Sequence, residues 1–97
     1  MTYRNRKLLN LAHDAPCLAA FPHDCTEYKG VEPAHSDWSA FGRGAWHKSA
    51  DWAFAAMCHT AHITLDTFDR ETKRMEWLRA HVATQDWLWS NEKVRVA

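Results

Sequence analysis

The chain has 97 residues, and its 12 basic residues balance its 12 acidic residues. This length predicts one domain, 1–97, with a small core that a structural metal would help to stabilise. Zero net charge argues against a protein that coats DNA without specificity, although it leaves room for a local basic cleft. The 46% of hydrophobic residues predicts a globular chain. We find neither a membrane span nor a signal peptide, which predicts a cytoplasmic protein without a membrane partner.

The three cysteines cannot all pair with one another, so we interpret them as thiols or metal ligands rather than a disulfide framework. Cys17 and Cys25 lie in the segment 16–30, where two prolines and Gly30 predict a loop or a loose hairpin. The seven residues between them exceed the spacing of a zinc knuckle. This pair alone therefore fits buried thiols as well as a zinc site.

The first two thirds of the chain predict a helix, two strands and a second helix. Arg4–Ala12 predicts a short amphipathic helix with basic residues. Gly30–His35 and Asp51–Met57 predict two short strands that pair in antiparallel fashion around the loop 36–50. Cys58–Asp66 predicts a short helix that directly follows the second strand.

A long C-terminal helix is predicted to begin at the N-cap Asp69 and to stop at Ser90-Asn91. We assign its apolar face to the core, and this face consists of Phe68, Met75, Leu78, Val82 and Trp89. The alternation in Lys93-Val94-Arg95-Val96 predicts a short edge strand. An exposed aromatic surface is the candidate for a homodimer contact, and it would be formed by Trp77, Trp87 and Trp89.

The loop 36–50 is long for a compact domain, which favours a functional role. Two glycines flank Arg43, so its guanidinium and the nearby backbone can approach a phosphate. By charge and position, the candidate phosphate contacts are Arg43, His47 and Lys48. Solvated loop charges without a ligand explain these residues equally well.

Two histidines suit the hydrolysis of a phosphodiester bond, which needs a neutral base that activates water and a divalent cation on the phosphate. His35 ends the first predicted strand, and His62 lies on the short helix after the second strand. Cys58 and His62 are four residues apart, so a helix places both side chains on one face, within reach of a metal. The order matches a ββα-metal plan, with the two histidines 27 positions apart.

The ordered set of motifs resembles the small HNH endonucleases of phages and prophages, of the YbcO-like type. The resemblance covers nearly the whole chain and includes the two upstream cysteines, Ala34-His35-Ser36 and Asp51. It ends with Cys58, His62, Leu65 and Asp66, where the family shows C-x-x-C-H-x-x-[IL]-D. The resemblance implies an α+β fold with a small ββα-metal core, an N-terminal zinc-loop segment and a long C-terminal helix.

The resemblance also implies a role for each matched residue. His35 would be the general base, and Asp51 would orient it in place of the middle asparagine of the family. His62 would bind the catalytic Mg²⁺ or Mn²⁺. A structural Zn²⁺ would be held by Cys17, Cys25 and Cys58.

The zinc site departs from the family pattern, because Ala61 stands where the family has its second helix cysteine. The fourth ligand could be His59 or His23. Alternatively, His62 completes the zinc site and is lost to catalysis. A third alternative is that the zinc is lost and the cysteines are buried thiols.

The catalytic site departs at Ala34, where many HNH enzymes have a metal-binding aspartate. The second ligand must then be Asp37, Asp66 or water, which Mg²⁺ accepts readily. The expected function is a metal-dependent DNA endonuclease, encoded by a phage or prophage and located in the cytoplasm of the bacterial host. The alternative is a noncatalytic zinc-binding or nucleic-acid-binding module on the same fold. A thiol-based redox protein is disfavoured, because the chain has no C-x-x-C motif.

Overall fold

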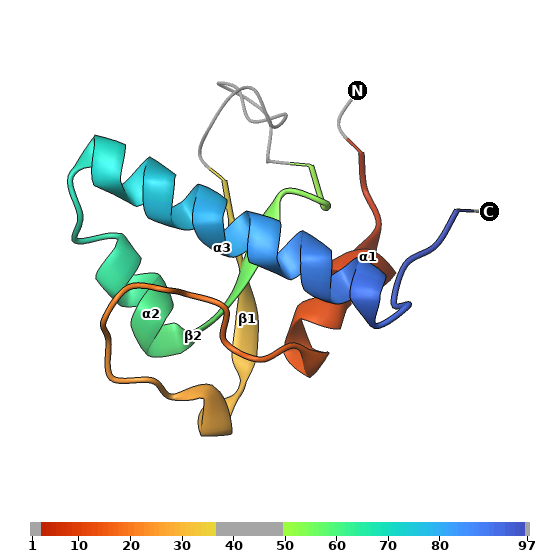
Figure 1. The fold of residues 1–97 in the computed structure, drawn as a ribbon, viewed down its shortest axis with the longest axis horizontal. Helices are drawn as coiled ribbons and strands as arrows, with labels where there is room; N and C mark the ends of the chain where they lie inside the picture. The colour runs from red at the N-terminus through yellow and green to blue at the C-terminus, as the bar shows by residue number, and fades with distance from the viewer. Residues whose placement is uncertain (1–2, 37–49, 97) are drawn as a thin grey trace.

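The computed structural model describes residues 3–36 and 50–96. A long helix, α3, crosses a pair of strands, with α1 near one end of α3 and α2 near the other (Figure 1). The described residues therefore form a small α+β fold with a two-stranded antiparallel sheet, as predicted. The elements follow in the order α1 (Arg6–Asn10), η1 (Leu11–Asp14), η2 (Glu27–Lys29), β1 (Val31–His35), β2 (Phe54–Cys58), α2 (His59–Leu65) and α3 (Arg70–Ser90).

A proline lies within β1, and the pairing of the strands explains why it is tolerated. Pro33 stands opposite Ala56 of β2. The N–H of Ala56 donates to Thr84 Oγ1 at 2.9 Å, and its carbonyl accepts from the N–H of Leu18 at 2.9 Å. Both groups of Ala56 are thus used away from β1. The Pro33–Ala56 pair needs no hydrogen bond between the strands, so a residue without an N–H fits there.

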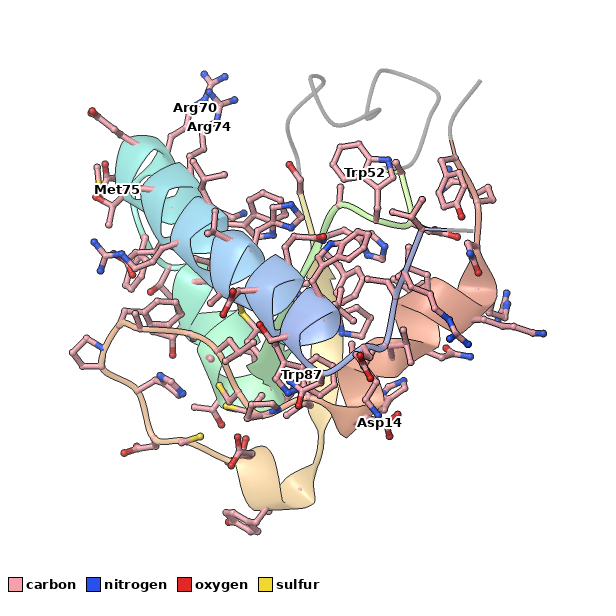
Figure 2. All side chains as sticks on the ribbon, turned by 45° about the vertical axis from the view of Figure 1, so that its right-hand side comes forward. Asp14, Trp52, Arg70, Arg74, Met75 and Trp87 are labelled. Atoms are coloured by element: carbon pink, nitrogen blue, oxygen red, sulfur yellow. The ribbon has the colours of Figure 1, made fainter. Side chains whose placement is uncertain are left out.

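The face of α3 that packs on the strands is not the predicted one. The expected core residues Met75, Leu78, Val82 and Trp89 are exposed, and Phe68 is only partly buried. Figure 2 shows Met75 on the side of α3 that faces away from the strands. The buried face contains small and polar residues, so hydropathy periodicity predicts the wrong face of the helix to be buried. It consists of Trp77, Ala80, His81, Thr84 and Leu88.

The polar residues of this buried face bind the edge of β2 that β1 leaves open. His81 Nδ1 lies 2.7 Å from the carbonyl of Phe54, and Thr84 Oγ1 accepts from Ala56. Burial lowers the pKa of His81, although the carbonyl of Phe54 opposes this shift. A neutral ring then donates through Nδ1–H. The histidine and the threonine are therefore core residues, because a strand edge needs hydrogen-bond partners.

The ends of α3 agree with the prediction, whereas the last segment does not. Asp69 is the N-cap and accepts from the N–H of Thr72, and Asn91 is the C-cap. The segment 93–96 is not a strand, and Val94 packs beside Leu88 instead. Trp77 is buried and so does not belong to the predicted exposed aromatic surface, while the homodimer contact stays a prediction. Within the described residues, no helix combines the length and apolar character needed to cross a membrane.

Candidate metal centre and active site

Three cysteines and one histidine converge at the start of α2. One ligand atom from each of Cys17, His23, Cys25 and Cys58 lies within 4.8 Å of the others. The first three come from the loop between η1 and β1, and Cys58 ends β2. Cys58 is buried, whereas Cys25 is exposed. The cluster therefore joins the N-terminal loop to the junction between β2 and α2, as the resemblance implied for the cysteines.

Backbone N–H groups point at the two less accessible thiols. Cys58 Sγ accepts from the N–H groups of Thr26 and Ala61, each at 3.4 Å, and Cys17 Sγ accepts from the N–H of Cys58 at 3.3 Å. Burial raises the pKa of Cys58, but its N–H donors outweigh burial and lower this pKa to about 6. Burial dominates at Cys17 and raises its pKa to about 11. Because the thiolate is the form that binds metals, the N–H donors at Cys58 favour the form that would ligate a metal.

His23 presents the correct ring nitrogen to the thiols. Its Nδ1 lies 2.8 Å from the carbonyl of Phe21, and its Nε2 lies 3.6 Å from Cys17 Sγ. An Nδ1–H that donates to the carbonyl leaves a lone pair on Nε2, which is the usual arrangement of a histidine ligand. Zn–S bonds of about 2.3 Å place tetrahedral donors about 3.4–3.8 Å apart. The Cys17–His23 distance lies in this range, and the donor set fits a Cys₃His structural zinc site.

Of the two histidines predicted as the fourth zinc ligand, the structure brings His23, and not His59, to the three cysteines. The side chain of His59 is 70% exposed, and its Nδ1 lies 3.0 Å from Glu32 Oε1. His62 also lies outside the cluster, with its Nδ1 2.6 Å from Glu32 Oε2. Both histidines face β1 rather than the cysteine loop. His62 is thus left for another role, and Glu32, which the sequence analysis did not single out, orients it.

We predict that His23→Ala weakens zinc binding by more than about 100-fold, because even an outer partner of a zinc ligand contributes about 10- to 100-fold. His59→Ala is the matched control, because it removes an imidazole that contacts Glu32 and lies outside the cysteine cluster. Native mass spectrometry and competition with a chromogenic chelator measure the two variants. Equal zinc retention by His23→Ala and His59→Ala would contradict the ligand set.

A second group of side chains lines a small hollow of about 40 Å³ between β1, α2 and α3. His35 enters it from the end of β1 and His62 enters it from α2. Asp66, Lys73 and Arg74 also line it, and Asp66 Oδ1 lies 3.0 Å from Lys73 Nζ. The fold thus brings together the predicted base, the predicted metal ligand and one candidate for the second ligand.

His62 is held by a carboxylate on its outer side. Two histidine partners lower the pKa of Glu32, although partial burial of this group acts in the opposite direction. An Nδ1–H of His62 that donates to Glu32 leaves Nε2 as the acceptor. This is the pattern in which a carboxylate fixes the tautomer and the orientation of a metal-binding histidine.

Basic residues gather where α3 begins, and the sequence analysis missed them. Lys73 and Arg74 line the hollow, and Arg70 lies one turn earlier. Figure 2 shows Arg70 and Arg74 projecting together from this end of the helix. The sequence could have identified them, because Arg70 is followed three and four residues later by Lys73 and Arg74, and a helix places residues at these spacings on one face. The apolar pattern of this helix predicts a role in packing alone.

Other predicted site residues stay predictions. The carboxylate of Asp51 accepts from the N–H of Asn5 at 2.6 Å and lies 3.3 Å from Arg4 Nη1, so it holds the start of α1. It precedes β2, which begins three residues later than predicted. Orientation of His35 by Asp51 is therefore not shown. Four further predicted residues lie outside the described part of the chain, namely Asp37, Arg43, His47 and Lys48.

Comparison with known proteins adds no assignment. The chain matches no protein-family model, no curated protein and no solved structure. The resemblance to the HNH endonucleases therefore depends on the motifs alone. Any inference about function depends on the geometry of the metal centre and of the hollow.

Proposed function

We propose that this protein is a metal-dependent DNA endonuclease of the HNH type, whose ββα core is formed by β1, β2 and α2. The observation that carries the proposal is the convergence of His35 and His62 on one hollow, although they are 27 positions apart. Hydrolysis of a phosphodiester bond needs a base and a metal ligand on opposite sides of the phosphate. Lys73 and Arg74 supply positive charge at the same hollow.

In this proposal, His35 accepts a proton from the water that attacks phosphorus, and its place at the exposed end of β1 leaves room for the substrate. His62 would hold the cation through Nε2, because its Nδ1 is turned to Glu32. When bound, Mg²⁺ or Mn²⁺ would neutralise charge on the phosphate and on the leaving oxygen. Asp66 lines the same hollow as His62, so its carboxylate would be the second ligand of the cation.

The zinc site supports the same proposal from the other side of α2. Cys58 is both a proposed ligand and the N-cap of α2, whose Sγ accepts from Ala61. His62 follows four residues later, about one helical turn. A zinc held by the cysteine loop would therefore fix the start of the helix that carries the catalytic ligand.

One observation favours the alternative, a noncatalytic zinc-binding module that binds nucleic acid. Ala34 is buried and lines the hollow, so it presents a methyl group where a ligand would be useful. Asp66 is the only carboxylate among the described residues that line the hollow, and it already pairs with Lys73. The catalytic ligand set would then rely mostly on water.

Nicking of supercoiled plasmid DNA in Mg²⁺ or Mn²⁺ tests the proposal. The wild type should nick, and His62→Ala should lose at least about 100-fold, because a catalytic cation contributes several kcal/mol. His59→Ala is the matched control, since His59 also contacts Glu32 but does not line the hollow. Absence of nicking by a zinc-loaded wild type would favour the noncatalytic module. Equal nicking by all three proteins would remove His62 from the mechanism.

A further inference from the structure

We propose that a groove at the C-terminal end of α3 binds single-stranded nucleic acid. The groove has a volume of about 640 Å³ and is formed by the N-terminal segment, the last turns of α3 and the C-terminal segment. Arg74 lines the hollow and Leu88 lines the groove. The two sites are therefore separated by about 21 Å along α3, at 1.5 Å per residue. The inference deepens the proposed nuclease function, because it names the form of its ligand.

The charged side chains that line the groove, among the described residues, are all positive. The described residues that line it include three cations and no carboxylate, although the whole chain has no net charge. The cations come from opposite ends of the chain and are brought together by the fold, and all three are exposed: Lys7, Lys93 and Arg95. A local excess of positive charge on a neutral protein favours a polyanion as the ligand.

Aromatic side chains are interleaved with these cations. Tyr3, Trp52 and Trp89 line the groove and are 50%, 38% and 52% exposed. Trp52 stands on the turn before β2, and its ring centroid lies 6.3 Å from that of His81 on α3. Large aromatic faces left in water are suited to stacking, and every nucleic-acid base offers a face that can stack on them.

The combination of cations and aromatic rings favours a single strand over the other ligands that a basic groove could bind. Duplex DNA keeps its bases stacked on one another, so it would use the cations and leave the aromatic rings without partners. A single strand uses both, because its phosphates follow the cations and its bases stack on the rings. A second copy of this chain, docked groove to groove about a twofold axis, would oppose the same three cations to each other.

Binding of a fluorescently labelled oligothymidylate of about 12 nucleotides, within the site sizes of single-strand binders, tests the inference by anisotropy without added divalent metal. Trp89→Ala should bind at least about fivefold more weakly, because one stacking ring is lost. Lys7→Ala and Lys93→Ala should each reduce the slope of log K against log salt by about 0.7. Tyr28→Ala and Lys29→Ala are the matched controls, because these exposed residues of η2 lie outside the groove.

The outcomes separate this inference from the nuclease proposal, because the assay measures no cleavage. Equal binding by the wild type, Trp89→Ala and Lys7→Ala would overturn the groove, whatever the plasmid assay shows. Weakening of duplex binding by Trp89→Ala as large as its weakening of single-strand binding would also overturn the preference of the groove for a single strand. Self-association that Trp89→Ala abolishes, without oligonucleotide binding, would identify a homodimer contact instead. Oligonucleotide binding by His59→Ala at wild-type strength is expected, because His59 does not line the groove.

Discussion

His35→Ala is expected to reduce metal-dependent nicking of plasmid DNA by about 10²- to 10⁴-fold, which is the usual contribution of a general base. His35 is exposed at the end of β1 and lines the hollow together with His62. Its removal creates no buried cavity, so the melting temperature and the zinc content should stay at the wild-type values. The measurement is the rate of conversion of supercoiled plasmid to the nicked form at saturating Mg²⁺.

Two controls distinguish a base from a structural residue. Imidazole added to His35→Ala should restore part of the nicking, which it would not do for a folding defect. His13→Ala is the matched variant, because His13 is also exposed and contacts the other end of β1, with Nδ1 2.9 Å from the carbonyl of Val31. Nicking at the wild-type rate by His35→Ala would exclude this residue as the base.

The order of the elements could be predicted from the sequence, because each depended on a local signal. Asp69 caps α3, Asn91 ends it, and a short apolar run before Cys58 predicted β2. The buried face of α3 could not be predicted in this way. Hydropathy periodicity assigns His81 and Thr84 to the surface, but they are buried because the open edge of β2 needs their hydrogen bonds. That requirement appears only when the strand and the helix are considered together.

The types of residue in the candidate site could be predicted from the sequence, but which of these residues lie together could not. The resemblance identified the three cysteines as a zinc set, although the spacing of the first two alone does not. The choice among His23, His59 and His62 depends on which way each side chain points in the fold. One residue decides it. Glu32 on β1 binds His59 and His62 and so turns both away from the cysteines. A carboxylate in the first strand gave no sequence signal for this role, because its partners are 27 and 30 positions away.

The geometry places the three cysteines with His23 in one site and His35 with His62 in another, and the two sites differ in chemistry. The soft donors gather in the Cys₃His cluster, which suits Zn²⁺. The hollow holds imidazole and carboxylate groups beside cations, which suits a hydrated hard cation and a phosphate. Cys58, the N-cap of α2, and His62, within α2, belong to different sites. The zinc site would therefore act on catalysis through the position of the helix and not through the reacting atoms.

Cys25→Ser is expected to lower the melting temperature by at least about 12 °C, although the Cys25 thiol is exposed. A surface substitution usually changes stability by no more than about 0.5 kcal/mol, so a large effect would come from the lost metal. Structural zinc contributes about 10–16 kcal/mol in zinc-finger peptides, while a whole domain has only about 5–15 kcal/mol of stability. A loss of about 3 kcal/mol would already lower the melting temperature of a domain of this size by about 12–24 °C.

Thermal unfolding followed by circular dichroism, with and without a chelator, separates the metal from the side chain. The chelator should bring the wild type down to the melting temperature of Cys25→Ser and should leave the variant unchanged, because the variant has no bound zinc to lose. Cys58→Ser should unfold at a still lower temperature, since it also places a hydroxyl in a fully buried position. If the chelator alters neither protein and Cys25→Ser melts with the wild type, the three cysteines are thiols packed without a metal, and α2 is held in place by the core alone.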